Sequence, residues 1–112
     1  MEKQAENIII LITTSSFHEA ERLAKTLVER RFVACGNIVR EVHSIFWWKD
    51  SLETEQEALL ILKSKMSLFS EIVAAVQSLH SYDVPEIIAL PIIAGSEAYL
   101  DWLTKETQPS PT

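Results

Sequence analysis

The sequence contains few of the residues that build the common kinds of active site. Its 112 residues include one cysteine, two glycines and three histidines. A single cysteine cannot form an internal disulfide, which favours a reducing compartment. No Gly-rich phosphate loop, G-x-S-x-G motif or Ser/His/Asp set is present. No C-x-x-C or H-x-x-x-H pair occurs either, which argues against a preformed transition-metal cage within one chain, while a metal site assembled between subunits stays open.

Positive charge and long apolar runs are also scarce. The formal net charge is -6, which argues against nucleic-acid binding because phosphate recognition depends on Lys and Arg. No run of about 18 apolar residues exists, so no membrane span is expected. The acidic segment 1–6 does not resemble a signal peptide. We therefore expect a cytoplasmic protein that binds neither nucleic acid nor membrane.

Three short runs are apolar without alternation, at residues 8–12, 58–62 and 87–90. Successive side chains of a strand point to opposite faces, so each of these strands must be covered on both sides. The sequence provides only two long amphipathic helices, which suffice for one face of a small sheet. Copies of the same chain are the simplest cover for the other face, so the pattern predicts a homo-oligomer.

The first helix is predicted from its cap and its apolar stripe. Ser16 and Glu19 have the spacing of a capping box. The stripe that follows has helical periodicity and consists of Ala20, Leu23, Ala24, Leu27 and Val28. A second helix is expected to start near Ser67 and to end at residues 80–83, ahead of Pro85.

Residues 33–65 read as a long β-hairpin with its turn at 49–51. Each arm is on the order of 36 Å long, so the tip with Trp47 and Trp48 must project or wrap around a partner. A fourth strand is predicted over residues 86–93, where Pro91 indicates an edge position or a bulge. A short final helix should begin after residues 95–96.

The element order is βαββαβ plus a short C-terminal helix. This order predicts an α+β, ferredoxin-like fold with an antiparallel sheet in which the first and third strands are central. Those two strands are the most uniformly apolar, in agreement with central positions. We expect one domain over residues 1–112, with an ordered core of about 7–105.

Several side chains are candidates for chemistry. Cys35 is either a buried structural residue or a nucleophile that uses His80 as its base. Glu53, Glu55 and Glu57 share one strand face and could bind a hard cation, although such a stripe is commonly only solvated. Glu57 differs from the other two, because it and Lys63 bound a buried apolar segment and need partners.

Several segments together resemble the CutA divalent-cation-tolerance family over residues 7–105. They include A-C-x-N-I at 34–38, E-A-L-L-I-L-K at 57–63, H-x-Y-x-x-P-E at 80–86 and Y-L-x-W at 99–102. The resemblance implies a homotrimer of ferredoxin-like subunits with inward-facing sheets and exchanged edge strands. Such trimers are similar to PII-type regulators, which bind small effectors in clefts between subunits.

The resemblance also implies a set of site residues in the inter-subunit cleft: Cys35, Trp48, Glu57, Lys63, Tyr82, Glu86 and Trp102. His80 is the candidate metal ligand. Some family members have a Cys and a further His where this chain has Ile12 and Leu79, and both types are ligands that copper favours.

Three functions follow as hypotheses. The first is a non-enzymatic copper-tolerance trimer that requires no cofactor and binds a divalent metal such as copper weakly. The second is a PII-like module that binds an anionic metabolite or a protein partner near Lys63, Glu57 and Tyr82. The third is a thiol enzyme that uses Cys35 with His80.

Overall fold

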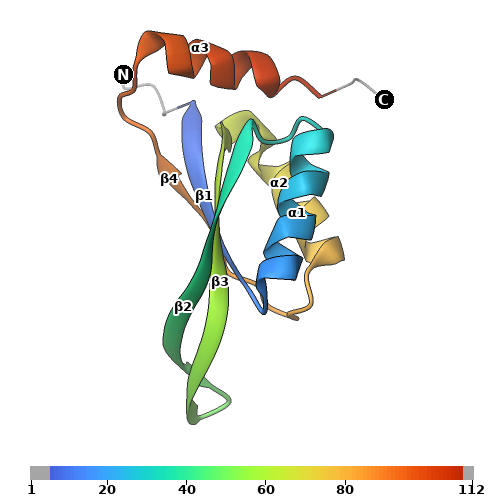
Figure 1. Ribbon diagram of the computed structural model, residues 1–112, viewed down its shortest axis with the longest axis vertical. Helices are drawn as coiled ribbons and strands as arrows, with labels where there is room; N and C mark the ends of the chain where they lie inside the picture. Colours follow the sequence, from blue (N-terminus) through green and yellow to red (C-terminus); the bar gives the residue numbers. More distant parts are fainter. Residues whose placement is uncertain (1–5, 110–112) are drawn as a thin grey trace.

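The computed structural model describes residues 6–109. Its elements are β1 (Asn7–Thr14), α1 (Phe17–Glu29), β2 (Cys35–Trp48), β3 (Ser51–Lys65), a 3₁₀ turn (Met66–Leu68), α2 (Phe69–Leu79), β4 (Ile87–Pro91) and α3 (Glu97–Glu106). The strands form one antiparallel sheet in the order β2-β3-β1-β4 (Figure 1). The α+β, ferredoxin-like prediction is therefore confirmed, with β1 and β3 at the centre.

The start of α1 differs in one respect from the predicted capping box. The Ser16 hydroxyl accepts a hydrogen bond from the Glu19 N–H at 3.1 Å, as expected for an N-cap. The Glu19 carboxylate, however, accepts from the N–H of Ser15 and not from that of Ser16. Only half of the capping box forms, because Glu19 is held by other partners that are described below.

The end of α1 is fixed by backbone geometry. Arg31 has a φ of 61°, in the left-handed region that commonly ends helices. The N–H groups of Arg31 and Phe32 donate to the carbonyls of Val28 and Leu27, each at 3.0 Å. This pattern is a Schellman motif, and it turns the chain from the helix into β2.

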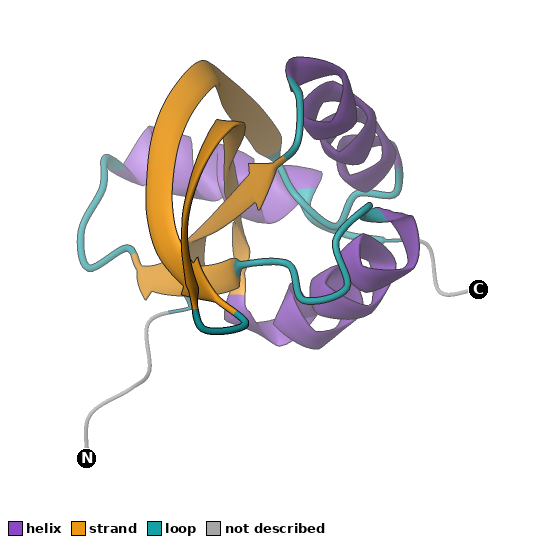
Figure 2. Cartoon of the chain, turned by 90° about the horizontal axis from the view of Figure 1, so that it is seen from below, coloured by secondary structure: helices purple, strands orange, loops and turns teal. Residues whose placement is uncertain are grey.

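Helices α1 and α2 lie together on one face of the sheet (Figures 1 and 2). Alternate residues of the two central strands point into this layer and are fully buried. The core residues are Ile8, Ile10, Ile12, Leu60 and Leu62 from the sheet, and Leu23, Leu27, Ile72 and Val76 from the helices. At roughly 1.5–3 kcal/mol for each large apolar side chain removed from water, this layer supplies the main stabilisation of the folded chain.

The opposite face of the sheet, which we call the open face, is also apolar. Ile9, Leu11, Leu59 and Ile61 are only partly buried there. On β4, Ile88 and Leu90 have exposed fractions of 48% and 47%. Helix α3 crosses the end of the sheet and leaves this face uncovered along most of its length (Figure 1). The expectation that the chain's own helices cover one face only is confirmed for the described residues.

The β2–β3 hairpin extends well beyond the helices (Figure 1). Trp48 pairs with Ser51, and the two loop residues Lys49 and Asp50 have φ values of 50° and 65°. Positive φ at both positions is typical of a type I′ turn, which suits the twist of a hairpin. The radius of gyration is 14.9 Å, larger than the value of about 13 Å for a compact chain of this length. Trp47, near the tip, is 72% exposed.

Three predicted boundaries are wrong by a few residues. The hairpin begins with β2 at Cys35 and not at residue 33. The α-helix begins at Phe69, because residues 66–68 form a 3₁₀ turn first. Strand β4 ends at Pro91 and not at Ile93. Its edge position is confirmed, and it stops there because Pro91 pairs with Ile8, next to the first residue of β1.

Candidate functional site

The structure divides most of the predicted site residues between the middle of β3, near Glu57, and its C-terminal end, near Lys63. One group, which we call the Tyr82 cluster, consists of Glu19, Glu57, His80, Ser81 and Tyr82. The other, the Cys35 cluster, consists of Cys35, Lys63, Tyr99 and Trp102. The loop after α2 supplies His80, Ser81 and Tyr82 to the first group as it runs back under the end of β1 toward β4 (Figure 1).

In the Tyr82 cluster, a hydroxyl and a carboxylate meet at the lower end of the open face. The Tyr82 hydroxyl donates to Glu57 Oε2 at 2.7 Å. Glu57 is only 7% exposed, although it lies in phase with the open-face residues of β3. Burial raises the pKa of Tyr82 above its ordinary value, and the hydrogen bond to Glu57 with that carboxylate's charge raises it further. Tyr82 is therefore a stable hydrogen-bond donor, and it supplies the partner that Glu57 was expected to need.

His80 is buried, and both of its ring nitrogens are engaged within the chain. Nε2 donates to the Thr13 carbonyl oxygen at 2.8 Å, and Nδ1 accepts from the Tyr82 N–H at 3.0 Å. An acceptor role for Nδ1 requires the neutral ring with its proton on Nε2. The Glu19 carboxylate lies 3.7 Å from Nδ1 and so faces a lone pair, not an ion-pair partner. A metal at His80 would have to displace one of these hydrogen bonds.

The described residues gather no group of three His, Cys, Asp or Glu side chains that could hold a metal ion. Ligation by His80 stays a prediction. It would need further donors, which the described residues of a single chain do not bring together.

Glu19 and its partner Ser81 are the residues of this cluster that the sequence analysis missed. Glu19 was assigned to the helix cap, but the structure buries its side chain against the loop after α2. The sequence held a signal for this, because Glu19 is in phase with the apolar stripe residues Leu23 and Leu27. A carboxylate at such a position needs hydrogen-bond donors from another segment.

The Cys35 cluster lies at the upper end of the sheet, where α3 crosses it. The Cys35 Sγ lies 3.5 Å from the Tyr99 hydroxyl, and the Tyr99 and Trp102 rings have centroids 5.5 Å apart. The hydrogen bond with Cys35 raises the pKa of Tyr99 to about 12, and burial adds to the shift. Lys63, which pairs with Cys35 across the strands, donates to the Asn37 side chain.

The separation of the two clusters corrects two expectations. Lys63 is six residues from Glu57 along β3, which corresponds to about 20 Å, so the two side chains do not form one site within a chain. The Cys35–His80 pair is also absent within one chain. His80 binds Thr13, which pairs with Leu59, whereas Cys35 pairs with Lys63 about 13 Å further along β3.

Trp48 and Glu86 join neither cluster. Trp48 lies at the hairpin tip with the Lys49 ammonium 5.8 Å from its ring centroid. Glu86 is exposed immediately before β4. Their assignment to an inter-subunit cleft stays a prediction.

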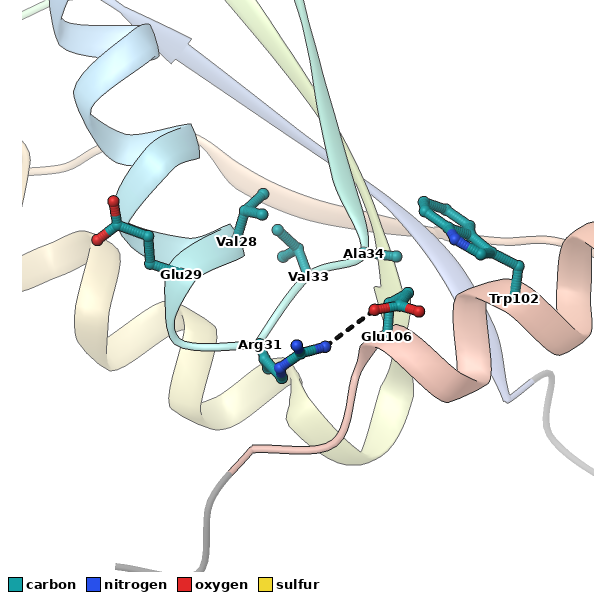
Figure 3. Close-up of a pocket in the computed structure, with 7 residues that line it drawn as sticks. All are labelled: Val28, Glu29, Arg31, Val33, Ala34, Trp102 and Glu106. Carbon is teal, nitrogen blue, oxygen red and sulfur yellow. Dashed lines mark hydrogen bonds and ion pairs between the residues drawn. The ribbon is translucent and has the colours of Figure 1, made fainter.

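A pocket of about 390 Å³ opens beside the Cys35 cluster, between the end of α1, the start of β2 and α3 (Figure 3). Its lining residues are Val28, Glu29, Arg31, Val33, Ala34, Trp102 and Glu106. Two of these lining residues, Arg31 and Glu106, form an ion pair between Nη1 and Oε1 at 2.9 Å (Figure 3). Among the predicted site residues, only Trp102 lines this pocket.

Within residues 6–109, the helices are too short or too polar to span a lipid bilayer. Residues 8–106 match the family described as CutA1 divalent ion tolerance protein. The chain belongs to the CutA1 family. The resemblance predicted from the sequence is thereby confirmed.

Relatives with known names support this assignment. The chain is 44% identical to the divalent-cation tolerance protein CutA of Thermus thermophilus over 99 residues, 88% of this chain and 96% of that protein. It is 38% identical to the chloroplastic protein CutA 1 of rice (Oryza sativa) over 93% of its own length. The chain spans 59% of that rice protein and 58% of the chloroplastic CutA of Arabidopsis thaliana.

Solved structures of CutA proteins share the fold. The structure of rice CutA1 superimposes with a TM-score of 0.90 at 37% identity, covering 96% of this chain and 98% of that one. The structure described as the periplasmic divalent cation tolerance protein CutA of Archaeoglobus fulgidus gives a TM-score of 0.89 at 38% identity, covering 91% and 99%. The cytoplasmic location expected from the sequence stays a prediction, because these relatives are named for other compartments.

Proposed function

We propose that this CutA1 family member acts in the tolerance of divalent cations, including copper, as a non-enzymatic homotrimer. The observation that supports the assembly is the open face. A monomer in water would expose Ile88, Leu90 and the adjoining side chains of β1 and β3 as one apolar surface. Continuous apolar surfaces of this kind mark interfaces, and a second and third copy offer the matching surface.

The hairpin supports the same assembly. Its tip places Trp47 and its neighbour Leu52, 61% exposed, beyond the reach of the helices. The outer edge of β2 has unpaired backbone groups along an arm of 14 residues. Edges of this length pair readily with another chain, so strand exchange between subunits would cover both the edge and the tip.

The assembly is tested by replacing Ile61, in the middle of the open face, with Lys. A trimer buries this position, so Ile61→Lys should reduce the sedimenting mass toward that of one chain, since an unpaired buried ammonium is costly. Val28→Lys, on the helix layer, is the matched control and should leave the mass unchanged. A wild-type protein that sediments as a folded monomer at micromolar concentration would refute the trimer.

Copper binding is proposed as weak, with His80 as the candidate ligand. Calorimetric titration with copper should give weaker binding for His80→Ala than for the wild type. His43→Ala is the control, since His43 lies on the exposed hairpin. Identical isotherms for the His80 variant and the wild type would remove His80 from the metal site.

The second candidate is a PII-like module with a ligand site between subunits. The Tyr82–Glu57 pair favours it, because the pair lies where the open face meets the loop after α2. A hydroxyl donor beside a buried carboxylate can select a polar ligand by hydrogen bonding. A thermal-shift screen against metabolites should give stabilisation that is lost in Tyr82→Phe. A screen in which no metabolite raises Tm counts against this candidate.

A further inference from the structure

Glu19 is a buried carboxylate that accepts four hydrogen bonds, and within residues 6–109 no Lys or Arg forms an ion pair with it. Its Oε1 accepts from the Ser15 N–H and hydroxyl, each at 2.9 Å, and from the Ser81 hydroxyl at 3.1 Å. Its Oε2 accepts from the Ser81 N–H at 2.7 Å. Two of the four donors come from the start of α1, and two come from the loop 62 residues further along the chain. Hydrogen bonds to a charged acceptor are the stronger kind, so Glu19 joins these segments firmly.

The residues on either side of Ser81 are held as well. His80 bridges the Thr13 carbonyl of β1 and the Tyr82 N–H. The His80 and Tyr82 rings pack with their centroids 4.7 Å apart. Three consecutive residues of the loop are therefore fixed to α1 and β1, and the direction of the Tyr82 side chain follows from this backbone placement.

The Tyr82 side chain links the fixed loop to the open face of the sheet. Its hydroxyl reaches Glu57 on β3 at 2.7 Å. Apart from the Tyr82 hydroxyl, no side-chain donor to Glu57 is found within the described residues. Any displacement of the loop would therefore leave a buried carboxylate without its donor, which is costly.

We propose that Glu19 is a positioning residue, which fixes the place of the Tyr82 hydroxyl, and through it Glu57, by holding the loop at residues 80–82. The site that these two side chains form is thus controlled from the helix layer on the other side of the sheet. The inference rests on the proposed function in one respect only, namely that the Tyr82–Glu57 site binds a ligand. The link from Glu19 to Tyr82 can be measured without any ligand.

The test uses the two tyrosines of the chain. In a Tyr99→Phe background labelled with 3-fluorotyrosine, Tyr82 gives a single ¹⁹F NMR resonance. Glu57→Leu removes the hydrogen-bond acceptor and so defines the resonance of a released Tyr82 hydroxyl. Glu19→Gln keeps the shape of the side chain but replaces one accepting carboxylate oxygen by an NH2 group. This group is itself a donor, so it cannot accept the hydrogen bonds from Ser15 or Ser81. We expect its Tyr82 resonance to shift toward the position found for Glu57→Leu.

Two control variants separate positioning from general destabilisation. Leu27→Ala creates a cavity in the core at the far end of α1 and so lowers the stability of the fold. Glu29→Gln removes an exposed carboxylate from the same helix. Both should leave the Tyr82 resonance at its parent position, provided that sedimentation gives the same oligomeric state for all variants.

A folded Glu19→Gln protein with an unshifted Tyr82 resonance would overturn the proposal. If Glu19→Gln does not fold, Ser81→Ala removes one of the two links to the loop and should give a smaller shift in the same direction. An unshifted resonance in Ser81→Ala would then overturn it equally. The trimer can fail its sedimentation test while this shift is still observed, so the two proposals fail independently.

Discussion

The stability of this fold in acid should depend on Glu19. Its side chain is 5% exposed. Burial opposes ionisation of this carboxyl, but the hydrogen bonds from Ser15 and Ser81 outweigh burial and lower the pKa from 4.5 to about 2. Because the pKa is lower in the folded state, the unfolded chain takes up the proton first. Ionised Glu19 therefore stabilises the fold fully above about pH 4.5, and this contribution is lost as the pH falls toward 2.

The size of the effect follows from the difference between the two pKa values. At about 1.4 kcal/mol per unit, the ionised carboxylate contributes roughly 3 kcal/mol to the free energy of unfolding. For a domain of this size, that is a substantial part of a total of about 5–15 kcal/mol. Acid unfolding should therefore begin in the range where Glu19 becomes protonated.

The assay is urea unfolding of the wild type and of Glu19→Gln at several pH values. The wild type should be the more stable protein at neutral pH, and its advantage should shrink by roughly 3 kcal/mol between about pH 5 and pH 2. Protomer concentrations must match, since association adds to apparent stability. Glu29→Gln, which removes an exposed carboxylate, should show no such trend. An advantage over Glu19→Gln that stays constant with pH would refute the reasoning.

Three further predictions concern single contacts. Ser16→Ala removes the N-cap of α1 and should lower the free energy of unfolding by about 1 kcal/mol in urea; an unchanged midpoint would contradict the cap. Lys49→Asn combined with Asp50→Gly places residues that tolerate positive φ in the hairpin turn and should raise Tm, whereas a lower Tm would contradict the type I′ assignment. Cys35→Ala should lower the pKa of Tyr99 from about 12 toward 10 in an ultraviolet titration of the tyrosines; an unchanged first transition would contradict the contact.

The main elements of the fold could be predicted from local pattern. The apolar run at 8–12 became a central strand, and the stripe from Ala20 to Val28 became α1. The boundaries were less predictable, because they depend on partners. Strand β4 ends at Pro91 because its partner β1 begins there. Residues 92 and 93 are both Ile, so the local sequence does not predict the end of the strand.

The candidate site was predicted only in part. Glu57 was expected to need a partner, but that this partner is Tyr82 depends on the path of the loop after α2. Lys63 was expected beside it, yet the strand itself separates the two by about 20 Å. Glu19 was assigned to a local cap because its spacing from Ser16 fits one, while two of the four donors to its carboxylate belong to Ser81, 62 residues away.

Local residue pattern is enough to predict the periods of the strands and helices, the ferredoxin-like order of these elements and the excess of apolar surface on the sheet. These properties are local or additive, so they can be counted along the chain. The tertiary structure alone decided which polar groups meet: Glu19 with Ser81, His80 with Thr13, and Tyr82 with Glu57. Such pairs depend on how distant segments are brought together, and hydrogen bonds form only within about 3 Å, so a small change in loop path would replace them.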